Sequence, residues 1–343
     1  MTVPKVPTVL VTGATGFLGR QVISTFLQKE EGQIIAAARN PQKSNQNVNE
    51  WRIGDLRDPE YRKSVVQGID VLCHCGTWAS MWGHPQAERD NFFLPTLDLF
   101  EQAIQAGVKR IILTSAVSVC DPPKPGKPGL DDAPSVKRPY WPHLNYLIDI
   151  DSWMRANAHR GTGMVVMRLG HFVGAQNRLG LVPAILPRMK TRMMPWLSGG
   201  RKRLALVTDE DLGQSFFLAA KASKLDPYES FNICGSEFPT MREFLTFLAE
   251  ETGLPKPIYS VPYSLGYGFG WLMEKLFPFL PGKAPFLTRS LVLLSEDWFC
   301  PSQKAEQKLG YTPQKPWRDA VRESLNQFKD SHFPWPHLAQ ISK

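Results

Sequence analysis

A glycine-rich turn close to the start of the chain constrains the fold more than any other feature of the sequence. The turn Thr12-Gly13-Ala14-Thr15-Gly16-Phe17-Leu18-Gly19 follows an apolar run and precedes apolar residues at helical spacing. Gly13 permits a tight turn, Gly16 lets the backbone approach a pyrophosphate, and Gly19 lets a helix pack on the preceding strand. The helix N-terminus adds amide donors and the positive end of a dipole. We therefore predict a dinucleotide site that includes Gly13, Gly16, Phe17, Leu18 and Gly19.

The first half of the chain alternates between strand-like and helix-like patterns. Short apolar runs occur at 9–11, 34–38, 71–73, 111–113 and 164–167, and two of the helical patterns between them span about 88–106 and 146–158. Continuous apolar runs are typical of strands buried on both faces, as in parallel sheets that helices cover on either side. The predicted fold class is therefore α/β, with a doubly wound parallel (Rossmann) sheet.

The length of 343 residues suits about two domains. We predict a nucleotide-binding Rossmann domain over residues 1–174, with 205–235 returning to it. Prolines become frequent beyond residue 175, and residues 175–343 are predicted to form a smaller α/β cap that binds substrate. Within the cap, Thr240-Met241-Arg242-Glu243 is a capping box, which predicts a helix that runs to Gly253.

The end of the second predicted strand indicates which dinucleotide is bound. An acidic residue at this place accepts hydrogen bonds from the ribose 2′-hydroxyl and favours NAD. Here Arg39 stands in the sequence Ala38-Arg39-Asn40-Pro41, and a guanidinium can pair with a 2′-phosphate. The sequence therefore favours NADP, with NAD as the alternative if Arg39 only stacks on the adenine.

With these features, the sequence resembles the extended short-chain dehydrogenase/reductases over nearly its whole length. The branch it is most similar to contains 3β-hydroxysteroid dehydrogenases and related bacterial ketone reductases. The segments that carry the resemblance, besides the glycine turn, are 54–58 (GDLRD), 70–74 (DVLCH), 76–77 (GT), 82–83 (WG), 107–110 (GVKR), 231–233 (FNI) and 308–311 (KLGY). The resemblance implies that Asp55, Leu56, Gly76 and Thr114 bind the cofactor, with Asp55 on the adenine amine.

The resemblance also shows where catalytic residues are expected, and this chain departs from the family there. The family uses a serine, a tyrosine and a lysine four residues after the tyrosine. Aligned on these motifs, Ala116 stands at the serine position, His143 at the tyrosine position and Leu147 at the lysine position. No lysine occurs between Lys137 and Lys190, so a change of register does not restore the pair.

Other side chains near these positions could serve proton transfer. Histidine as a residue type suits acid–base work at neutral pH, and His143 stands at the tyrosine position. His171 follows the sixth strand, on a loop that by resemblance faces the nicotinamide and the substrate. We name His143, His171 and Tyr146 as candidate proton donors, and Ser115 or Ser118, which flank Ala116, as the group that polarises the substrate oxygen. The alternative is that the two histidines are only polar residues of the pocket wall.

Three functions follow from this combination of an intact glycine turn and a substituted catalytic set. The leading hypothesis is an enzyme, an NAD(P)H-binding oxidoreductase that acts on a hydrophobic, steroid-like or polycyclic carbonyl or alcohol with non-standard proton delivery. The first alternative is a non-redox lyase, isomerase or cyclase on the same scaffold. The second is a catalytically impaired binding protein that senses the nucleotide.

Charge and composition limit the partners. Ten of the basic residues fall between Asp151 and Asp209, a stretch without any acidic residue, and the net charge is +8. Such a region attracts phosphates, an anionic substrate or an anionic membrane face. Without a nucleic-acid-binding motif, DNA and RNA are not expected. The aromatic segment 261–281 is predicted to line an apolar pocket, and its alternative use is peripheral contact with a membrane. By resemblance, the chain could form a homodimer.

The sequence predicts a cytoplasmic protein, in solution or at a membrane surface. It contains no run of 18 apolar residues, and Met1-Thr2-Val3-Pro4-Lys5 leaves no room for a signal peptide. Its five cysteines form no C-x-x-C pair, which favours a reducing compartment. Cys73-His74-Cys75 lies in a predicted strand, where alternation directs His74 away from both cysteines, so no metal site is expected.

Overall fold

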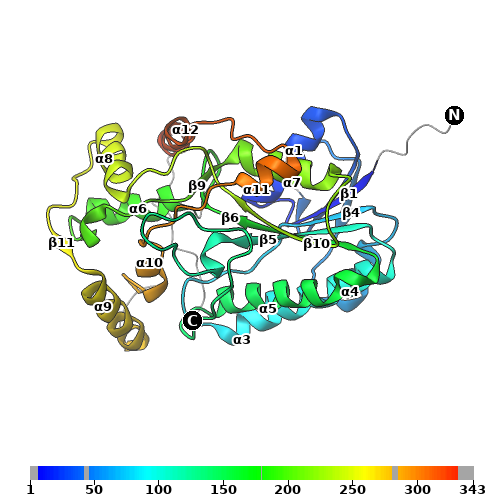
Figure 1. Cartoon of the computed structure of the whole chain (residues 1–343), viewed down its shortest axis with the longest axis horizontal. Coiled ribbons are helices and arrows are strands. Elements are labelled where there is room, and N and C mark those ends of the chain that lie inside the picture. The colour runs from blue at the N-terminus through cyan, green and yellow to red at the C-terminus, as the bar shows by residue number, and fades with distance from the viewer. Residues whose placement is uncertain (1–6, 42–45, 179, 280–284, 331–343) are drawn as a thin grey trace.

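A parallel sheet forms the centre of the computed structural model, which describes residues 7–41, 46–178, 180–279 and 285–330. Its seven strands lie in the order β10-β6-β5-β4-β1-β2-β3, and every neighbouring pair is parallel (Figure 1). The strands are β1 (Thr8–Thr12), β2 (Gln33–Ala38), β3 (Glu50–Ile53), β4 (Val71–His74), β5 (Arg110–Ala116), β6 (Gly163–Leu169) and β10 (Tyr228–Ile233). The doubly wound α/β prediction is confirmed.

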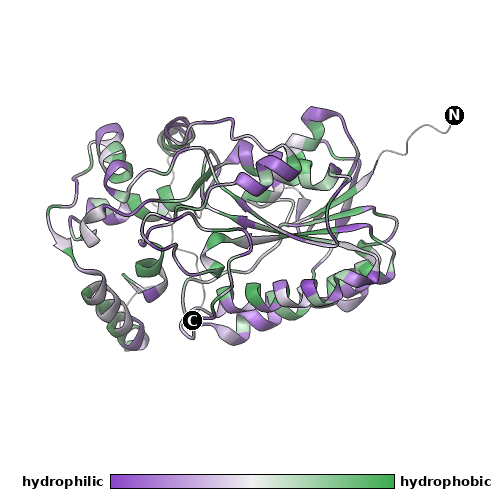
Figure 2. Cartoon of the chain, viewed as in Figure 1, coloured by the Kyte–Doolittle hydropathy of each residue, from purple (hydrophilic) through white to green (hydrophobic). Residues whose placement is uncertain are grey.

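Helices cover both faces of this sheet, which explains the continuous apolar runs in the sequence. Within β1, Val9 and Val11 point into one core layer, and Leu10 points into the other. The first layer lies under α1 (Phe17–Lys29), α7 (Asp209–Lys221) and α11 (Gln303–Leu309). The second lies under α2 (Pro59–Val65), α4 (Leu94–Gln105) and α5 (Pro142–Asn157). Figure 2 shows the strands and the inward helix faces as predominantly hydrophobic.

A smaller group of elements lies beyond the carboxyl ends of the central strands (Figure 1). A third apolar core holds much of it together, with Val182, Phe244 and Trp317 among its buried members. Two short parallel strand pairs belong to this part, β7 (His171–Val173) with β9 (Leu206–Thr208), and β8 (Trp196–Leu197) with β11 (Ser260–Val261). Its helices are α6 (Leu181–Lys190), α8 (Met241–Thr252), α9 (Tyr263–Leu276), α10 (Arg289–Leu293) and α12 (Trp317–Asp330).

The capping box is confirmed at the start of α8. The Thr240 side chain accepts a hydrogen bond from the Glu243 amide, and the Glu243 carboxylate accepts one from the Thr240 amide. The helix ends at Gly253, which has a φ of 70°. The start therefore follows from local side-chain hydrogen bonds, and the end follows from the left-handed conformation that glycine permits.

Two helices begin at other residues than predicted, and one strand was not predicted. The helix predicted from residue 146 begins at Pro142, since proline suits the first position of a helix. The helix predicted from residue 88 begins with α3 (Pro85–Glu88), and a wider turn over 89–93 leads from it into α4. The four-residue strand β3 had no clear pattern, because it lies at the sheet edge and its ends are exposed.

The expectation that segment 261–281 lines an apolar pocket is wrong for most of its large side chains. Leu265, Phe269, Trp271, Leu272 and Leu276 face solvent from α9. The helix packs inward through Gly266 and Gly270 instead.

None of the described helices is both long enough and apolar enough to cross a bilayer. The residues Met1 to Lys5 lie outside the described part of the chain.

Candidate functional site

Backbone packs directly on backbone where β1 turns into α1. Gly13 has a φ of 63°, in the left-handed region, and a Cβ atom there would lie 2.6 Å from the Cα of Gly76. A Cβ on Gly19 would lie 2.3 Å from the carbonyl oxygen of Gly13. The turn, the end of β4 and the first turn of α1 can therefore meet only because these positions are glycines.

The start of α1 offers amide donors on an open surface. Gly16 precedes the helix, and no side chain caps it. The amides of Phe17 and Leu18 in the first turn have no acceptor within the helix. A Cβ on Gly16 would meet a single atom within 4 Å, the carbonyl oxygen of Gly13 at 3.1 Å. An uncapped helix end with a bare backbone approach fits the pyrophosphate of a dinucleotide.

Two arginines and a carboxylate lie beyond the ends of β2 and β3. Arg39 is exposed. Arg57 donates to the Asp55 carboxylate, with its Nη2 2.7 Å from Oδ2 and its Nε 3.1 Å from Oδ1. Hydrogen bonds from Arg57 hold the pKa of Asp55 below its usual range, and the charge of Arg39 acts in the same direction. Leu56 is half-buried against the core. Sequence reasoning missed Arg57, although the D-L-R spacing makes the pairing local.

A buried polar network fixes the carboxyl ends of β1, β4 and β5. The ring of His74 lies between two hydroxyls, with Nδ1 2.8 Å from Thr12 Oγ1 and Nε2 3.1 Å from Thr96 Oγ1. Desolvation lowers the pKa of His74 to about 4, so the ring is neutral at pH 7. Thr12 Oγ1 also accepts the amide hydrogen of Gly76 at 3.3 Å, and the Thr114 hydroxyl donates to the His74 carbonyl at 2.9 Å.

The serines beside Ala116 lie in the interior. Ser115 is buried on β5, and its hydroxyl has no hydrogen-bond partner among the described residues. Ser118 is buried in the turn after this strand, where its carbonyl oxygen accepts a hydrogen bond from Arg138. Thr114 and Ala116 are partly accessible. Because side chains alternate along a strand, Ser115 faces the side opposite to these two.

His143 is bound to a buried carboxylate. Its Nδ1 lies 2.9 Å from Oε2 of Glu88, whose side chain is 0% exposed. The other carboxylate oxygen, Oε1, accepts the Ser80 amide hydrogen at 2.7 Å. The Trp141 indole donates to the Ser80 carbonyl at 3.1 Å, which secures that loop against the start of α5. An ionised carboxylate only accepts hydrogen bonds, so Nδ1 of His143 is the donor in this contact when Glu88 is ionised.

Sequence reasoning missed Glu88. It lies 55 residues before His143, and no local motif joins the two. The pair forms because α3 and the start of α5 pack together beyond the ends of β4 and β5.

The next candidates on α5 have structural contacts. The Tyr146 hydroxyl donates to the Pro85 carbonyl at 3.2 Å, and its ring stacks on Phe93 with centroids 4.7 Å apart. Leu147 is buried in the core at the position where the family is expected to carry lysine. A lysine at this depth would place an ammonium group in an apolar layer.

His171 lies at the start of β7, just beyond β6. Its amide donates to the Ala205 carbonyl at 2.6 Å. Desolvation lowers the pKa of His171 to about 4, so this ring too is neutral at pH 7. Within the described part of the chain, it makes neither a hydrogen bond nor a ring contact with His143. The convergence of the two histidines on one pocket stays a prediction.

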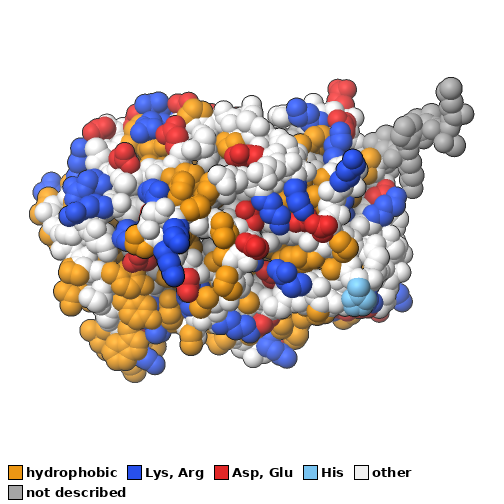
Figure 3. All heavy atoms as spheres, viewed as in Figure 1, with side chains coloured by type: hydrophobic (Ala, Val, Ile, Leu, Met, Phe, Trp, Pro, Cys, Tyr) orange, Lys and Arg blue, Asp and Glu red, His pale blue; other side chains and the backbone are white. Residues whose placement is uncertain are grey.

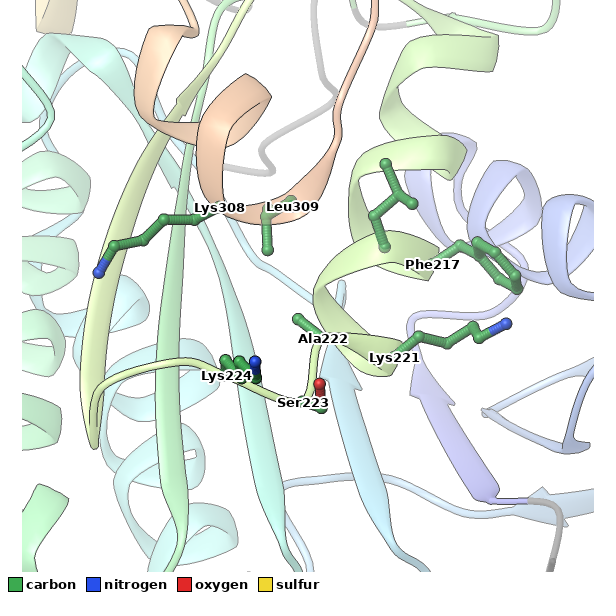
Figure 4. A pocket seen from close by; sticks show the side chains of 8 residues that line it. Phe217, Lys221, Ala222, Ser223, Lys224, Lys308 and Leu309 are labelled. Carbon is green, nitrogen blue, oxygen red and sulfur yellow. The ribbon is translucent and has the colours of Figure 1, made fainter.

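A basic pocket of about 360 Å³ lies elsewhere, beside the amino end of β10 (Figure 4). Two of its three lysines form ion pairs: Lys221 pairs with Glu31, and Lys308 pairs with Asp226 and Glu229. In sheets of this type, ligands bind at the carboxyl ends of the strands, so this pocket is not the candidate active site.

The cysteines carry no sign of metal binding. Cys73 points into the core layer opposite to the one that surrounds His74, as strand alternation predicts. All five cysteines are free and buried. In the described residues, no three His, Cys, Asp or Glu side chains gather in a way that could hold a metal ion.

Comparisons with known proteins agree with this arrangement. The profile of the NAD-dependent epimerase/dehydratase family matches residues 9–234. A 2-alkyl-3-oxoalkanoate reductase of Stenotrophomonas maltophilia is 26% identical, covering 94% of this chain and 98% of its own length. The decarboxylating sterol-4-alpha-carboxylate 3-dehydrogenase of Mus musculus is 23% identical over 93% of this chain and 90% of its own.

A solved structure has the same fold. The crystal structure of gox2253 covers 95% of this chain and 98% of its own, with a TM-score of 0.76 and 23% identity. The matched family is one of NAD-dependent epimerases and dehydratases, and the two relatives are by name a reductase and a dehydrogenase, consistent with an oxidoreductase. The family match spans the glycine turn, the strands β1 to β6 and β10, and the start of α5. The chain therefore belongs to the NAD-dependent epimerase/dehydratase family.

Proposed function

We propose that this protein is an NADP(H)-dependent oxidoreductase of a hydrophobic carbonyl or alcohol, and that His143 delivers the proton. The observation that carries the proposal is the hydrogen bond between His143 and the buried Glu88 at the start of α5. The position where the family is expected to carry a tyrosine acid is thus occupied by a histidine, a residue type that often serves as a general acid or base.

The residues that would hold the dinucleotide are those of the glycine turn and the strand ends around it. Gly13, Gly16, Phe17 and Leu18 fit the pyrophosphate, and Arg39 fits a 2′-phosphate, which supports NADP over NAD. Gly76 and Thr114 lie at the ends of β4 and β5, on the path toward the substrate. When bound in its reduced form, the nicotinamide supplies the hydride.

The Glu88–His143 pair can donate a proton without changing its geometry. The carboxylate holds Nδ1–H and stabilises a charge on the ring, as a carboxylate does for the histidine of a hydrolase triad. As hydride reaches the carbonyl carbon, Nε2–H of a protonated His143 gives its proton to the carbonyl oxygen. The product is the alcohol, and solvent returns a proton to the ring. In the oxidation direction, neutral His143 accepts the proton of the alcohol.

The named relatives support a hydrophobic substrate. One is a reductase of 2-alkyl-3-oxoalkanoates and the other a 3-dehydrogenase of a sterol, so both names describe a ketone or secondary alcohol on an apolar body. Aromatic rings that join the loop after β4 and the segment before α5 to α9 and the turn after it suit such a body. Trp82 and Phe277 meet with centroids 4.9 Å apart, and Tyr140 and Tyr267 with centroids 5.8 Å apart. We propose a steroid-like or long-chain alkyl ketone as the substrate class.

The first prediction concerns this proton donor. His143→Gln should lower kcat for ketone reduction by about 10² to 10⁴, the usual contribution of a positioned acid. Glu88→Gln should lower it by a smaller factor while leaving the Kd of NADPH unchanged, because Glu88 acts through the ring. Tyr146→Phe is the matched control and should leave kcat nearly unchanged.

The assay follows NADPH oxidation with a 2-alkyl-3-oxoalkanoate and a 3-ketosteroid, over a range of pH. A His143→Gln variant with normal kcat, or a loss that falls on Tyr146→Phe instead, contradicts the assignment. Product formation without any change in nicotinamide absorbance would indicate the non-redox alternative. Dinucleotide binding without turnover would indicate a nucleotide-sensing protein.

A further inference from the structure

Helix α9 turns its apolar side toward solvent. Leu265, Phe269, Leu272 and Leu276 follow one another at intervals of four, three and four residues, so they form one stripe along the helix. These side chains are 65%, 46%, 42% and 43% exposed. Trp271 lies beside the stripe and is also exposed. An apolar stripe at this spacing normally faces a core.

The opposite side of α9 explains this orientation. A Cβ on Gly266 would lie 2.9 Å from Cδ2 of Leu197, and one on Gly270 would lie 3.0 Å from the Thr288 backbone. The acidic residue of the helix, Glu274, is also on the inner side, where it pairs with Arg289 at 2.7 Å. Rotating the stripe inward would drive large side chains into this close backbone contact. The exposed stripe is therefore fixed by packing.

The apolar surface continues from α9 onto adjoining segments, and we call the whole the α9 surface. Its other members are Phe279, just after the helix, and Met193, Ile258 and Tyr259, which are all exposed. Tyr259 and Met193 are joined by a hydrogen bond, and β11, next to Tyr259, pairs with β8. Elsewhere in the described ranges, only Ile53, Leu94 and Leu130 are large, apolar and exposed. Figure 3 shows hydrophobic side chains gathered at the lower left, where Figure 1 places α9.

Exposed charges on this surface are positive. Lys275 lies on the outer side of α9, and Arg192 lies next to Met193; both are exposed. The stretch between Asp151 and Asp209, which contributes Arg192 and Met193, has no acidic residue and ten basic ones. A second copy of the chain docked here would bring like charges together, whereas an anionic lipid surface would attract them.

We propose that the α9 surface docks the protein on an anionic bilayer. The stripe lies in the headgroup region with Phe269, Trp271 and Leu272 among the acyl chains, and Lys275 and Arg192 contact lipid phosphates. Such a mode needs an apolar face and flanking cations on a helix that lies along the interface. It agrees with the finding that none of the described helices is suited to span a bilayer.

The test is flotation of the full chain with vesicles of phosphatidylcholine alone or with a third of phosphatidylglycerol. We expect binding that is strong only with the anionic lipid and falls with added salt. The triple variant Leu265→Ser, Phe269→Ser, Leu272→Ser should bind at least about tenfold more weakly, since each exposed apolar side chain inserted adds to the affinity. Arg192→Glu with Lys275→Glu should lower binding to anionic vesicles by a similar factor.

Controls separate docking from misfolding and from self-association. Leu130→Ser removes an equally exposed apolar side chain outside α9 and should bind as the parent does. All variants should keep the parent's circular dichroism and thermal midpoint. If the parent protein binds neither type of vesicle, the proposal is wrong. It is also wrong if the triple variant binds vesicles normally, or if the main effect of that variant is to dissociate an oligomer in sedimentation.

Discussion

At the residue scale, two histidines near the carboxyl ends of the strands have different hydrogen-bond partners. His74 lies between the hydroxyls of Thr12 and Thr96 and below the rings of Phe92 and Phe100, where a charge has no counterion. His143 instead has its Nδ1 2.9 Å from the buried carboxylate of Glu88. The first is thus a neutral structural link, whereas the second is held by an acidic group, as our proposal for the proton donor requires.

Burial of His74 predicts a pH-dependent stability. Its pKa is about 4 in the folded chain and about 6.5 when unfolded, so between these values only the unfolded state binds the proton. Stability should therefore fall by about 2 kcal/mol from pH 7 to pH 5 through this group. Urea unfolding at both pH values measures the fall. In His74→Gln the fall should be smaller by that amount, and an equal fall in both proteins would disprove this role.

Arg39 predicts a cofactor preference. Arg39→Ser should raise the Kd of NADPH by at least about tenfold and leave that of NADH nearly unchanged, because a charge-assisted contact with the 2′-phosphate is lost. Fluorescence titration of the cofactor-free protein measures both constants. Arg318→Ser, an exposed arginine of α12, controls for the loss of one positive charge. A parent protein that prefers NADH would overturn the NADP proposal.

At the element scale, the glycines between β1 and α1 have two different roles, one in folding and one in the proposed binding of the cofactor. Gly13 and Gly19 are needed for folding, because a Cβ at either would overlap backbone atoms. Gly16 has ordinary backbone angles, with a φ of −78°, and space on all but one side. Its lack of a side chain fits the pyrophosphate that we propose to bind at this turn.

Gly16→Ala should therefore separate binding from folding. We expect a stability change below about 1 kcal/mol, as for other changes at a helix N-cap, and at least about tenfold weaker binding of NADPH. Thermal unfolding and titration measure the two effects. Gly268→Ala, at an open position on α9, should change neither the fold nor the cofactor affinity. If Gly16→Ala binds NADPH as the parent does, the pyrophosphate does not bind at this turn.

At the scale of the whole molecule, the resemblance implies a homodimer formed through two helices that flank the sheet. We propose α4 and α5, because Leu94 on α4 is the exposed large apolar side chain among the described helices that cover the sheet. Sedimentation should give twice the 38.7 kDa of one chain. Leu94→Glu should shift the equilibrium to monomer, with Leu130→Glu as control. A parent that is monomeric at every concentration would contradict the dimer.

Much of the fold could be predicted because its determinants are local. The five apolar runs became β1, β2, β4, β5 and β6, and the capping box became α8. Short edge strands and helix starts were less predictable, since β3 is ordered mainly by pairing with β2. For α9, apolar content suggested burial, yet glycine packing on Leu197 and Thr288 turned the stripe outward.

The sequence alone determined the α/β class, the glycine turn and the lack of a lysine four residues after Tyr140 or Tyr146, because each depends on residues close together in the chain. Only the tertiary structure decided which side chain forms a hydrogen bond with His143. The carboxylate of Glu88 reaches the ring across 55 residues, through the packing of two helices beyond the sheet. The tertiary structure also decided that Ser115 and Ser118 are buried and that α9 exposes its apolar side. These outcomes depend on packing between distant segments, which short-range sequence patterns do not record.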